Sequence, residues 1–237
     1  MTRCSGVARN PISIRFSEMS TPFSPELFQQ LPIVGILRGL SAISLRSVVE
    51  AVCDGGLTNL EITMNTPGAA DQIQVAREIA GSALNIGAGT VTDLRLLEDA
   101  LSAGASFIVT PTVAVPVIER CGQLQVPVFP GAFSPTEIVR AWELGATMVK
   151  IFPAEFPGPA YLRSLKATLP HLKLMPTGGV DVATLEAYAK AGADAYGVGS
   201  PLFRAERIAA QDWEWLRNQC RAFAGVYRKT KQSFIAG

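Results

Sequence analysis

The sequence predicts a single-domain α/β protein folded as a (β/α)8 (TIM) barrel. Eight short apolar runs alternate with helix-length amphipathic segments from residue 31 onward, and such alternation is typical of parallel sheets. Glycines recur where a helical segment meets the next run, in the place where a glycine ends a helix. The 237 residues also suit this barrel, which typically needs about 250. An open doubly wound sheet is the alternative.

The eight runs are interpreted as strands that are covered on both faces, because they are almost continuously apolar. The eight runs span residues 33–38, 57–63, 84–89, 106–110, 126–131, 147–152, 172–179 and 194–199. Eight parallel strands are the number that closes into a barrel. A final helix is expected over residues 209–229, where apolar residues recur at helical spacing.

Several local signals mark where the helices begin and end. A capping box is predicted at Ser134–Glu137, with proline at the first helical position, and Asp181 is predicted to cap the helix that follows "PTGGV". Four glycines are predicted to end helices in the left-handed conformation, namely Gly55, Gly104, Gly145 and Gly192.

The chain divides into a flexible N-terminal extension over residues 1–24 and a barrel over residues 25–237. The extension is rich in Ser and Arg and has no acidic residue before Glu18. It lacks the apolar core of a secretion signal. A transit peptide is one alternative, and a start of translation at Met19 is another.

Charge and cysteine usage narrow the function classes. The formal net charge is +1 and no basic run is present, which argues against nucleic acid or a membrane as a partner. The cysteines are scattered without a C-x-x-C pair, which argues against disulfides and a zinc site. We therefore expect a cytoplasmic protein that acts on a small molecule.

Two ionisable residues stand inside apolar strand segments, Glu61 in "NLEIT" and Lys150 in "MVKIF". Active sites of (β/α)8 barrels lie at the C-terminal ends of the strands, so both residues are candidates for chemistry. Burial favours the neutral amine of a lysine, which attacks carbonyl groups to form a Schiff base. Glu61 would transfer protons. A buried Lys150–Glu61 salt bridge without a catalytic role is the alternative.

Other catalytic chemistries find little support in the sequence. The single histidine, His171, falls in a loop-like segment and is expected to be exposed, which leaves no base for a Ser-His-Asp triad. Metal-binding motifs such as H-x-H, H-E-x-x-H and D-x-D are missing. We expect neither a metal nor a cofactor.

Two glycine-containing segments close the seventh and eighth runs. "PTGGV" contains Gly178 and Gly179, and "GVGS" contains Gly199 and Ser200. Barrels commonly bind phosphate after strands seven and eight, through backbone N–H groups. Ordinary βα turns are the alternative. "GAGT" (residues 87–90) is interpreted first as a turn and second as a site, in which Thr90 adds a hydroxyl group at the mouth.

The ordered motifs "GILRG", "LEIT", "IGAGTV", "IVTP", "VPVFPG", "VKIFPAE", "PTGGV" and "GVGS" resemble the class I, metal-independent aldolases that cleave 2-keto-3-deoxy-6-phosphogluconate (KDPG) or 4-hydroxy-2-oxoglutarate (KHG). The resemblance covers about residues 31–228. It implies that this chain is a lyase that releases pyruvate and an aldehyde, glyceraldehyde 3-phosphate or glyoxylate. It also implies a homotrimer of barrels.

The resemblance assigns roles to individual residues. Lys150 would form the Schiff base and Glu61 would be the general acid and base. The residues expected to bind substrate are Arg38, Asn65, Thr90, Pro111, Phe152 and Thr177, and those expected to hold its phosphate are Gly178, Gly179, Gly199 and Ser200.

One position departs from the family pattern. KDPG aldolases typically carry an arginine four residues after the glutamate, where it helps to bind the substrate carboxylate, and this chain has Asn65 there. With Asn65 at this position, the chain is similar to the branch of the family that cleaves the C4 epimer, 2-keto-3-deoxy-6-phosphogalactonate (KDPGal). Arg38 is expected to supply the missing cation. Oxaloacetate decarboxylation is an expected side activity.

Two other functions are carried as alternatives. A phosphosugar epimerase or isomerase would share the phosphate glycines but would not need Lys150 as a nucleophile. A sugar-phosphate-binding regulator built on an inactive barrel would bind ligand without releasing pyruvate.

Overall fold

The computed structural model describes residues 22–235 and confirms the (β/α)8 barrel. One strand falls in each predicted run, every strand is shorter than its run, and β5 extends one residue beyond its run. The strands are β1 (Ile33–Leu37), β2 (Asn59–Thr63), β3 (Asn85–Gly89), β4 (Ile108–Thr110), β5 (Val128–Ala132), β6 (Val149–Ile151), β7 (Leu174–Pro176) and β8 (Tyr196–Val198).

All strand pairs are parallel, and the order β7-β6-β5-β4-β3-β2-β1-β8 follows the chain except that β1 also pairs with β8. A single parallel bridge between Thr177 and Gly197 joins the end of β7 to β8. The amide of Asp194 also donates to the carbonyl of Leu174 at 2.9 Å. These contacts close the sheet into a barrel rather than the open doubly wound sheet.

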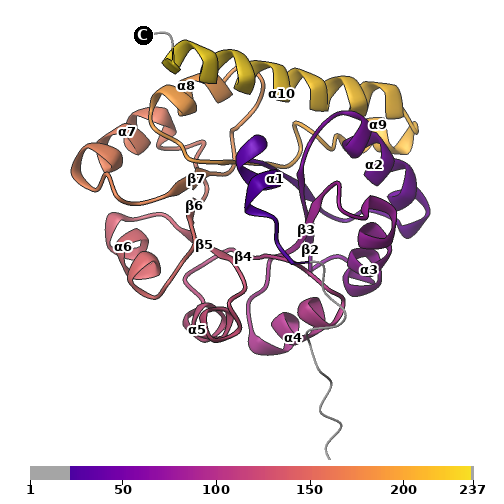
Figure 1. Cartoon of the computed structure of the whole chain (residues 1–237), viewed down its shortest axis with the longest axis horizontal. Coiled ribbons are helices and arrows are strands. Elements are labelled where there is room, and N and C mark those ends of the chain that lie inside the picture. The colour runs from indigo at the N-terminus through magenta and orange to yellow at the C-terminus, as the bar shows by residue number, and fades with distance from the viewer. Residues whose placement is uncertain (1–21, 236–237) are drawn as a thin grey trace, which may run out of the picture.

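Ten helices are present in residues 22–235, and most of them surround the strands (Figure 1). They are α1 (Pro25–Gln30), α2 (Ala42–Asp54), α3 (Ala69–Ala80), α4 (Leu94–Ser102), α5 (Val115–Leu124), α6 (Pro135–Glu143), α7 (Gly158–Thr168), α8 (Leu185–Lys190), α9 (Ala205–Ala209) and α10 (Trp213–Ile235). None of these helices is both long enough and apolar enough to cross a membrane.

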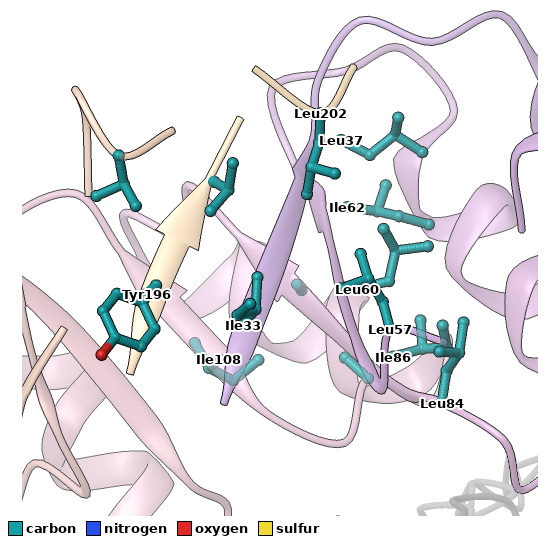
Figure 2. Packing of buried hydrophobic residues seen from close by; sticks show 14 of the residues in the cluster. Ile33, Leu37, Leu57, Leu60, Ile62, Leu84, Ile86, Ile108, Tyr196 and Leu202 are labelled. Carbon is teal, nitrogen blue, oxygen red and sulfur yellow. The ribbon is translucent and has the colours of Figure 1, made fainter. Parts of the chain in front are cut away.

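Two hydrophobic clusters follow from the alternation of side chains along each strand. The larger cluster packs strands against helices and includes Leu60 and Ile62 of β2 (Figure 2). The smaller cluster contains the alternate residues, such as Val34 of β1, Val109 of β4 and Phe129 of β5. The smaller cluster therefore fills the barrel interior.

Helix α1 lies across the centre of the ring in Figure 1 and closes one end of the barrel. Its Phe28 ring lies 5.6 Å from the Phe129 ring, and Phe129 lies 5.5 Å from Phe107, which immediately precedes β4. Because Phe107 marks the N-terminal end of its strand, α1 covers the base of the barrel. The C-terminal strand ends are left at the opposite, open mouth.

The expected extension over residues 1–24 lies outside the described residues except for its last three. Phe23 packs against Phe28 and Phe107, with ring centroids 5.6 and 5.9 Å apart. The Ser24 amide donates to Asn85 Oδ1 at 2.8 Å. Phe23 and Ser24 thus contribute to closing the barrel base.

The predicted helix signals are confirmed with two corrections. The Ser134–Glu137 capping box is present. The N-cap of α8 is Thr184 rather than the predicted Asp181, and Asp181 Oδ1 accepts the Thr184 amide in the turn that precedes the helix. Gly104, Gly145 and Gly192 have φ of 87°, 98° and 93°. In "DGGL", however, Gly55 stays in the right-handed region at φ −76° and Gly56 takes φ 80°. Packing still requires glycine at position 55, because a Cβ there would lie 2.4 Å from Cys220 Cβ.

We expect Phe28→Ala to lower the free energy of unfolding by about 3 kcal/mol, since the variant removes a buried aromatic side chain from the interior cluster. Urea unfolding measures this loss. Phe234→Ala is the matched control, because Phe234 is 55% exposed on α10. An equal loss in both variants would show that α1 does not stabilise the barrel.

Candidate active site

Glu61 and Lys150 both point into the barrel near its open mouth. In β2, Leu60 and Ile62 belong to the outer cluster (Figure 2), so Glu61 between them faces inward. In β6, Lys150 has the same parity as Met148, which lies in the interior cluster. The barrel thus directs one carboxyl group and one amine into the same interior.

The Glu61 side chain is buried without a hydrogen-bond partner. Glu61 is 1% exposed, and neither carboxylate oxygen accepts a hydrogen bond from the rest of residues 22–235. Burial raises the pKa of Glu61 above its ordinary value, and the positive charges of Lys150 and Arg38 oppose part of that rise. An unpartnered buried carboxyl group is costly for a purely structural role. It is suited to taking up and releasing a proton.

Lys150 is also buried, and burial shifts its pKa in the opposite direction. Lys150 is 5% exposed, and burial lowers the pKa of its amine. The Glu61 charge opposes this lowering, and the Arg38 charge adds to it. Lys150 Nζ lies 5.1 Å from the centroid of the Phe152 ring, which is 37% exposed. The neutral amine is therefore accessible at a lower pH than for a lysine in water.

The two groups do not form a closed salt bridge. A hydrogen-bonded pair would give at least one Glu61 oxygen a partner, and neither oxygen has one within the described chain. The alternative of a purely structural ion pair therefore lacks its defining contact.

Gly89, the last residue of β3, makes room for the Glu61 carboxyl group. A Cβ added to Gly89 would lie 1.6 Å from Glu61 Oε1 and 2.3 Å from its carboxyl carbon. Gly89 pairs with Thr63 in the β2–β3 register. Gly89 is not among the predicted site residues, because "GAGT" is interpreted from the sequence first as a turn, whereas residues 87–89 belong to β3. The small residues of "GAG" are the sequence signal of this close approach.

Arg38 follows β1 and continues the inward parity of Val34 and Ile36. Its side chain is exposed, and its charge acts on both Glu61 and Lys150. The next residue, Gly39, has φ 66°. Arg38 therefore places a cation at the rim of the mouth.

Other predicted binding residues also lie at strand ends. Thr90 follows β3 with φ 55°, and Thr177 forms the bridge that closes the barrel. The Pro111 carbonyl packs so closely on β5 that a Cβ at Gly131 would lie 2.3 Å from its oxygen. These three residues directly follow β3, β7 and β4 at the C-terminal ends of the strands.

The predicted phosphate glycines fall into two groups. Gly178 and Gly179 have consecutive positive φ values of 89° and 74°, a conformation that favours glycine. Packing also favours glycine at 179, because a Cβ there would lie 2.6 Å from Glu155 Cβ. Gly199 does not have a positive φ, and Ser200 after it is exposed.

Asn65 lies on the turn after β2 with an exposed side chain. No hydrogen bond to another described residue holds this side chain. His171 is exposed, as predicted. Across residues 22–235, no group of three or more His, Cys, Asp or Glu side chains is placed to hold a metal ion.

Comparisons with known proteins give one consistent result. A model of the KDPG and KHG aldolase family matches residues 25–219. The chain is 35% identical over 204 residues to 2-dehydro-3-deoxy-6-phosphogalactonate aldolase of Escherichia coli, covering 86% of this chain and 98% of that protein.

Solved structures agree with the sequence relatives. The chain is similar to a native KDPGal structure at 34% identity and a TM-score of 0.81, covering 90% of this chain and all of that one. It is also similar to a KDPG aldolase from Legionella pneumophila, with pyruvate captured as a covalent carbinolamine intermediate. That match has 26% identity, a TM-score of 0.78, and covers 83% of this chain and 96% of that one.

We expect Gly89→Ala to push the Glu61 carboxyl group out of its buried position, because the new methyl group occupies the same space. The pKa of Glu61 should then fall toward its ordinary value, since burial is the main cause of its rise. Carbon-13 NMR titration of glutamate-labelled protein measures this, with Glu61→Gln assigning the signal.

Gly122→Ala is the control, because a Cβ on this glycine of α5 meets no atom within 4 Å. An unchanged Glu61 titration in Gly89→Ala would show that β3 moves instead of the carboxyl group.

Proposed function

The chain belongs to the KDPG and KHG aldolase family and is an aldolase, and we propose that it cleaves a phosphorylated 2-keto-3-deoxy sugar acid through a Schiff base on Lys150. The products would be pyruvate and glyceraldehyde 3-phosphate. The observation that carries the proposal is the burial of Lys150 beside a Glu61 carboxyl group that has no hydrogen-bond partner in the described chain.

Formation of the Schiff base uses both groups. Neutral Lys150 Nζ attacks the C2 carbonyl carbon, and Glu61 transfers the amine proton to the carbonyl oxygen to give a carbinolamine. Protonated Glu61 then donates its proton to the departing hydroxyl group, which leaves as water. The product is a protonated imine and a Glu61 carboxylate. The raised pKa of Glu61 suits both directions of transfer.

The protonated imine then accepts the electrons of the C3–C4 bond. The Glu61 carboxylate takes the C4 hydroxyl proton as this bond breaks, and the aldehyde leaves. Glu61 returns the same proton to C3 of the remaining enamine. Water adds to the resulting imine, and pyruvate departs as Lys150 becomes a free amine again.

Backbone amides support binding of the substrate phosphate. Consecutive glycines with positive φ at 178 and 179 can direct N–H groups toward an anion. Both lie on the loop after β7, at the mouth that contains Lys150. We propose that Thr177, Gly199 and Ser200 complete this end of the site.

The substrate is proposed to be KDPG or its C4 epimer KDPGal. Asn65 in place of the usual arginine and the similarity to the Escherichia coli enzyme support the epimer. Unphosphorylated KHG, which would give glyoxylate, is the second candidate. Measuring kcat/KM for all three compounds assigns the preference.

The quaternary structure and location are also proposals. We propose a cytoplasmic homotrimer, and the family resemblance supports this assembly. Sedimentation of the purified protein tests it.

We expect borohydride reduction in the presence of pyruvate to add a pyruvyl group to Lys150, identified by peptide mass mapping. The trapping rate should rise with pH and level off below 10.5, the ordinary lysine pKa, because burial lowers the pKa of Lys150. Lys166→Met is the matched control. Lys166 Nζ lies 2.6 Å from Asp194 Oδ2, and this ion pair is remote from the mouth of the barrel.

Trapping on another lysine, or no trapping, would remove the Schiff-base mechanism. An epimerase or isomerase would show no trapping but would still convert a sugar phosphate. A binding regulator would show neither trapping nor turnover.

We expect Arg38→Ala to raise KM by about ten- to a hundredfold, the effect of losing a charged hydrogen bond to a carboxylate. Asn65→Arg in that background should recover part of the loss, because it restores a cation to the same rim of the mouth. Steady-state kinetics measure both effects. Arg46→Ala is the control, because Arg46 is an exposed cation on α2 that pairs with Glu50. An unchanged KM in Arg38→Ala would exclude Arg38 from substrate binding.

A further inference from the structure

We propose that Thr66 is a positioning residue that holds Arg38 at the mouth of the barrel through the backbone of Gly39. This inference rests on the proposed function, because it depends on Arg38 binding the substrate carboxylate. Thr66 does not contact the reacting atoms in this proposal, and its effect on substrate passes through Arg38.

The hydroxyl group of Thr66 links two loops that are far apart in sequence. The Gly39 amide donates to Thr66 Oγ1 at 2.9 Å. Thr66 is 5% exposed, so water does not readily replace its hydroxyl group as acceptor. Because Gly39 follows Arg38 directly, this hydrogen bond fixes the backbone from which the Arg38 side chain leaves.

Thr66 is itself hydrogen-bonded to β2, the strand that carries Glu61. Its Oγ1 lies 3.2 Å from Oγ1 of Thr63, a fully buried residue at the end of β2. The Thr66 amide donates to the Thr63 carbonyl at 2.9 Å, and the Ala69 amide donates to the Thr66 carbonyl at 3.1 Å. Arg38 is thus connected, through Gly39, Thr66 and Thr63, to a residue two positions from Glu61.

A second hydrogen bond supports the same loop from α3. Gln72 Nε2 donates to the Leu40 carbonyl at 2.9 Å, and Gln72 is 4% exposed. Leu40 is two residues after Arg38. Together the Thr66 and Gln72 contacts attach the β1–α2 loop to the β2–α3 segment at two points.

An exposed arginine needs such support to act on a substrate at a defined place. Arg38 has a long flexible side chain, and restraining its backbone reduces the number of positions that its guanidinium group can take. The substrate carboxylate would then meet a cation that is already at the rim. Loss of the Thr66 hydroxyl group should weaken binding more than it slows the chemical steps.

The test compares Thr66→Val with Thr66→Ser. Valine keeps the shape of threonine and removes the acceptor, so KM should rise about three- to tenfold, the range for one neutral hydrogen bond, while kcat changes less than twofold. Serine keeps the hydroxyl group and should restore KM. The substrate is the preferred phosphorylated epimer, and borohydride trapping with pyruvate is run in parallel.

Thr58→Val is the matched control. Thr58 Oγ1 donates to the Leu31 carbonyl at 3.0 Å at the base of the barrel, so this variant also loses a buried hydroxyl group. Thermal unfolding of the three variants shows whether stability falls alike. If Thr58→Val raised KM as much as Thr66→Val does, the effect of Thr66 would come from general structural stability and the inference would be wrong.

A double-mutant cycle with Arg38→Ala decides between positioning and a separate contact. If Thr66 acts through Arg38, Thr66→Val should leave KM unchanged in the Arg38→Ala background. The same fold-change in both backgrounds would overturn the inference. Failure of the proposed function is distinguished from this result, because it would abolish trapping on Lys150 in the unaltered protein.

Discussion

The site depends on keeping a carboxyl group and an amine out of water without letting them neutralise each other. Desolvation opposes the charged form of each group, and a short contact between them would restore both charges as a salt bridge. Glu61 has no hydrogen-bond partner in the described residues, so the arrangement avoids that outcome. Their protonation can therefore change as a substrate carbonyl enters, and such changes are what Schiff-base chemistry requires.

The rest of the barrel can be understood from this requirement. A firmly packed interior holds the two buried ionisable groups, and the aromatic cluster beneath α1 contributes to this packing at the closed base. Gly89 removes a side chain where the carboxyl group must fit. The strand register places Lys150 beside Gly131 and Met175, so small or apolar neighbours flank the amine on both adjacent strands.

Sequence patterns predicted the architecture because they are local. Apolar runs, capping boxes and helix-ending glycines depend on neighbouring residues, and they identified every strand. They could not predict contacts between strands: Gly89 under Glu61 depends on the β2–β3 register, and Thr66 against Gly39 depends on the packing of two loops. The close packing of Gly55 against Cys220 also depends on a residue that is distant in sequence.

In the proposed mechanism, the residues that carry the reaction and those that select the substrate lie on different parts of this fold. Glu61 and Lys150 belong to strands, whose positions are set by backbone pairing on both sides. Arg38 and Asn65 belong to loops, which lie outside the strand ladder and are attached to it by individual contacts such as the Gly39 amide with Thr66 Oγ1 and the Thr66 amide with the Thr63 carbonyl. We therefore expect a change at position 65 to alter the rim without moving the proposed reacting pair. This separation explains how one scaffold can retain a Schiff-base mechanism while its relatives cleave different epimers.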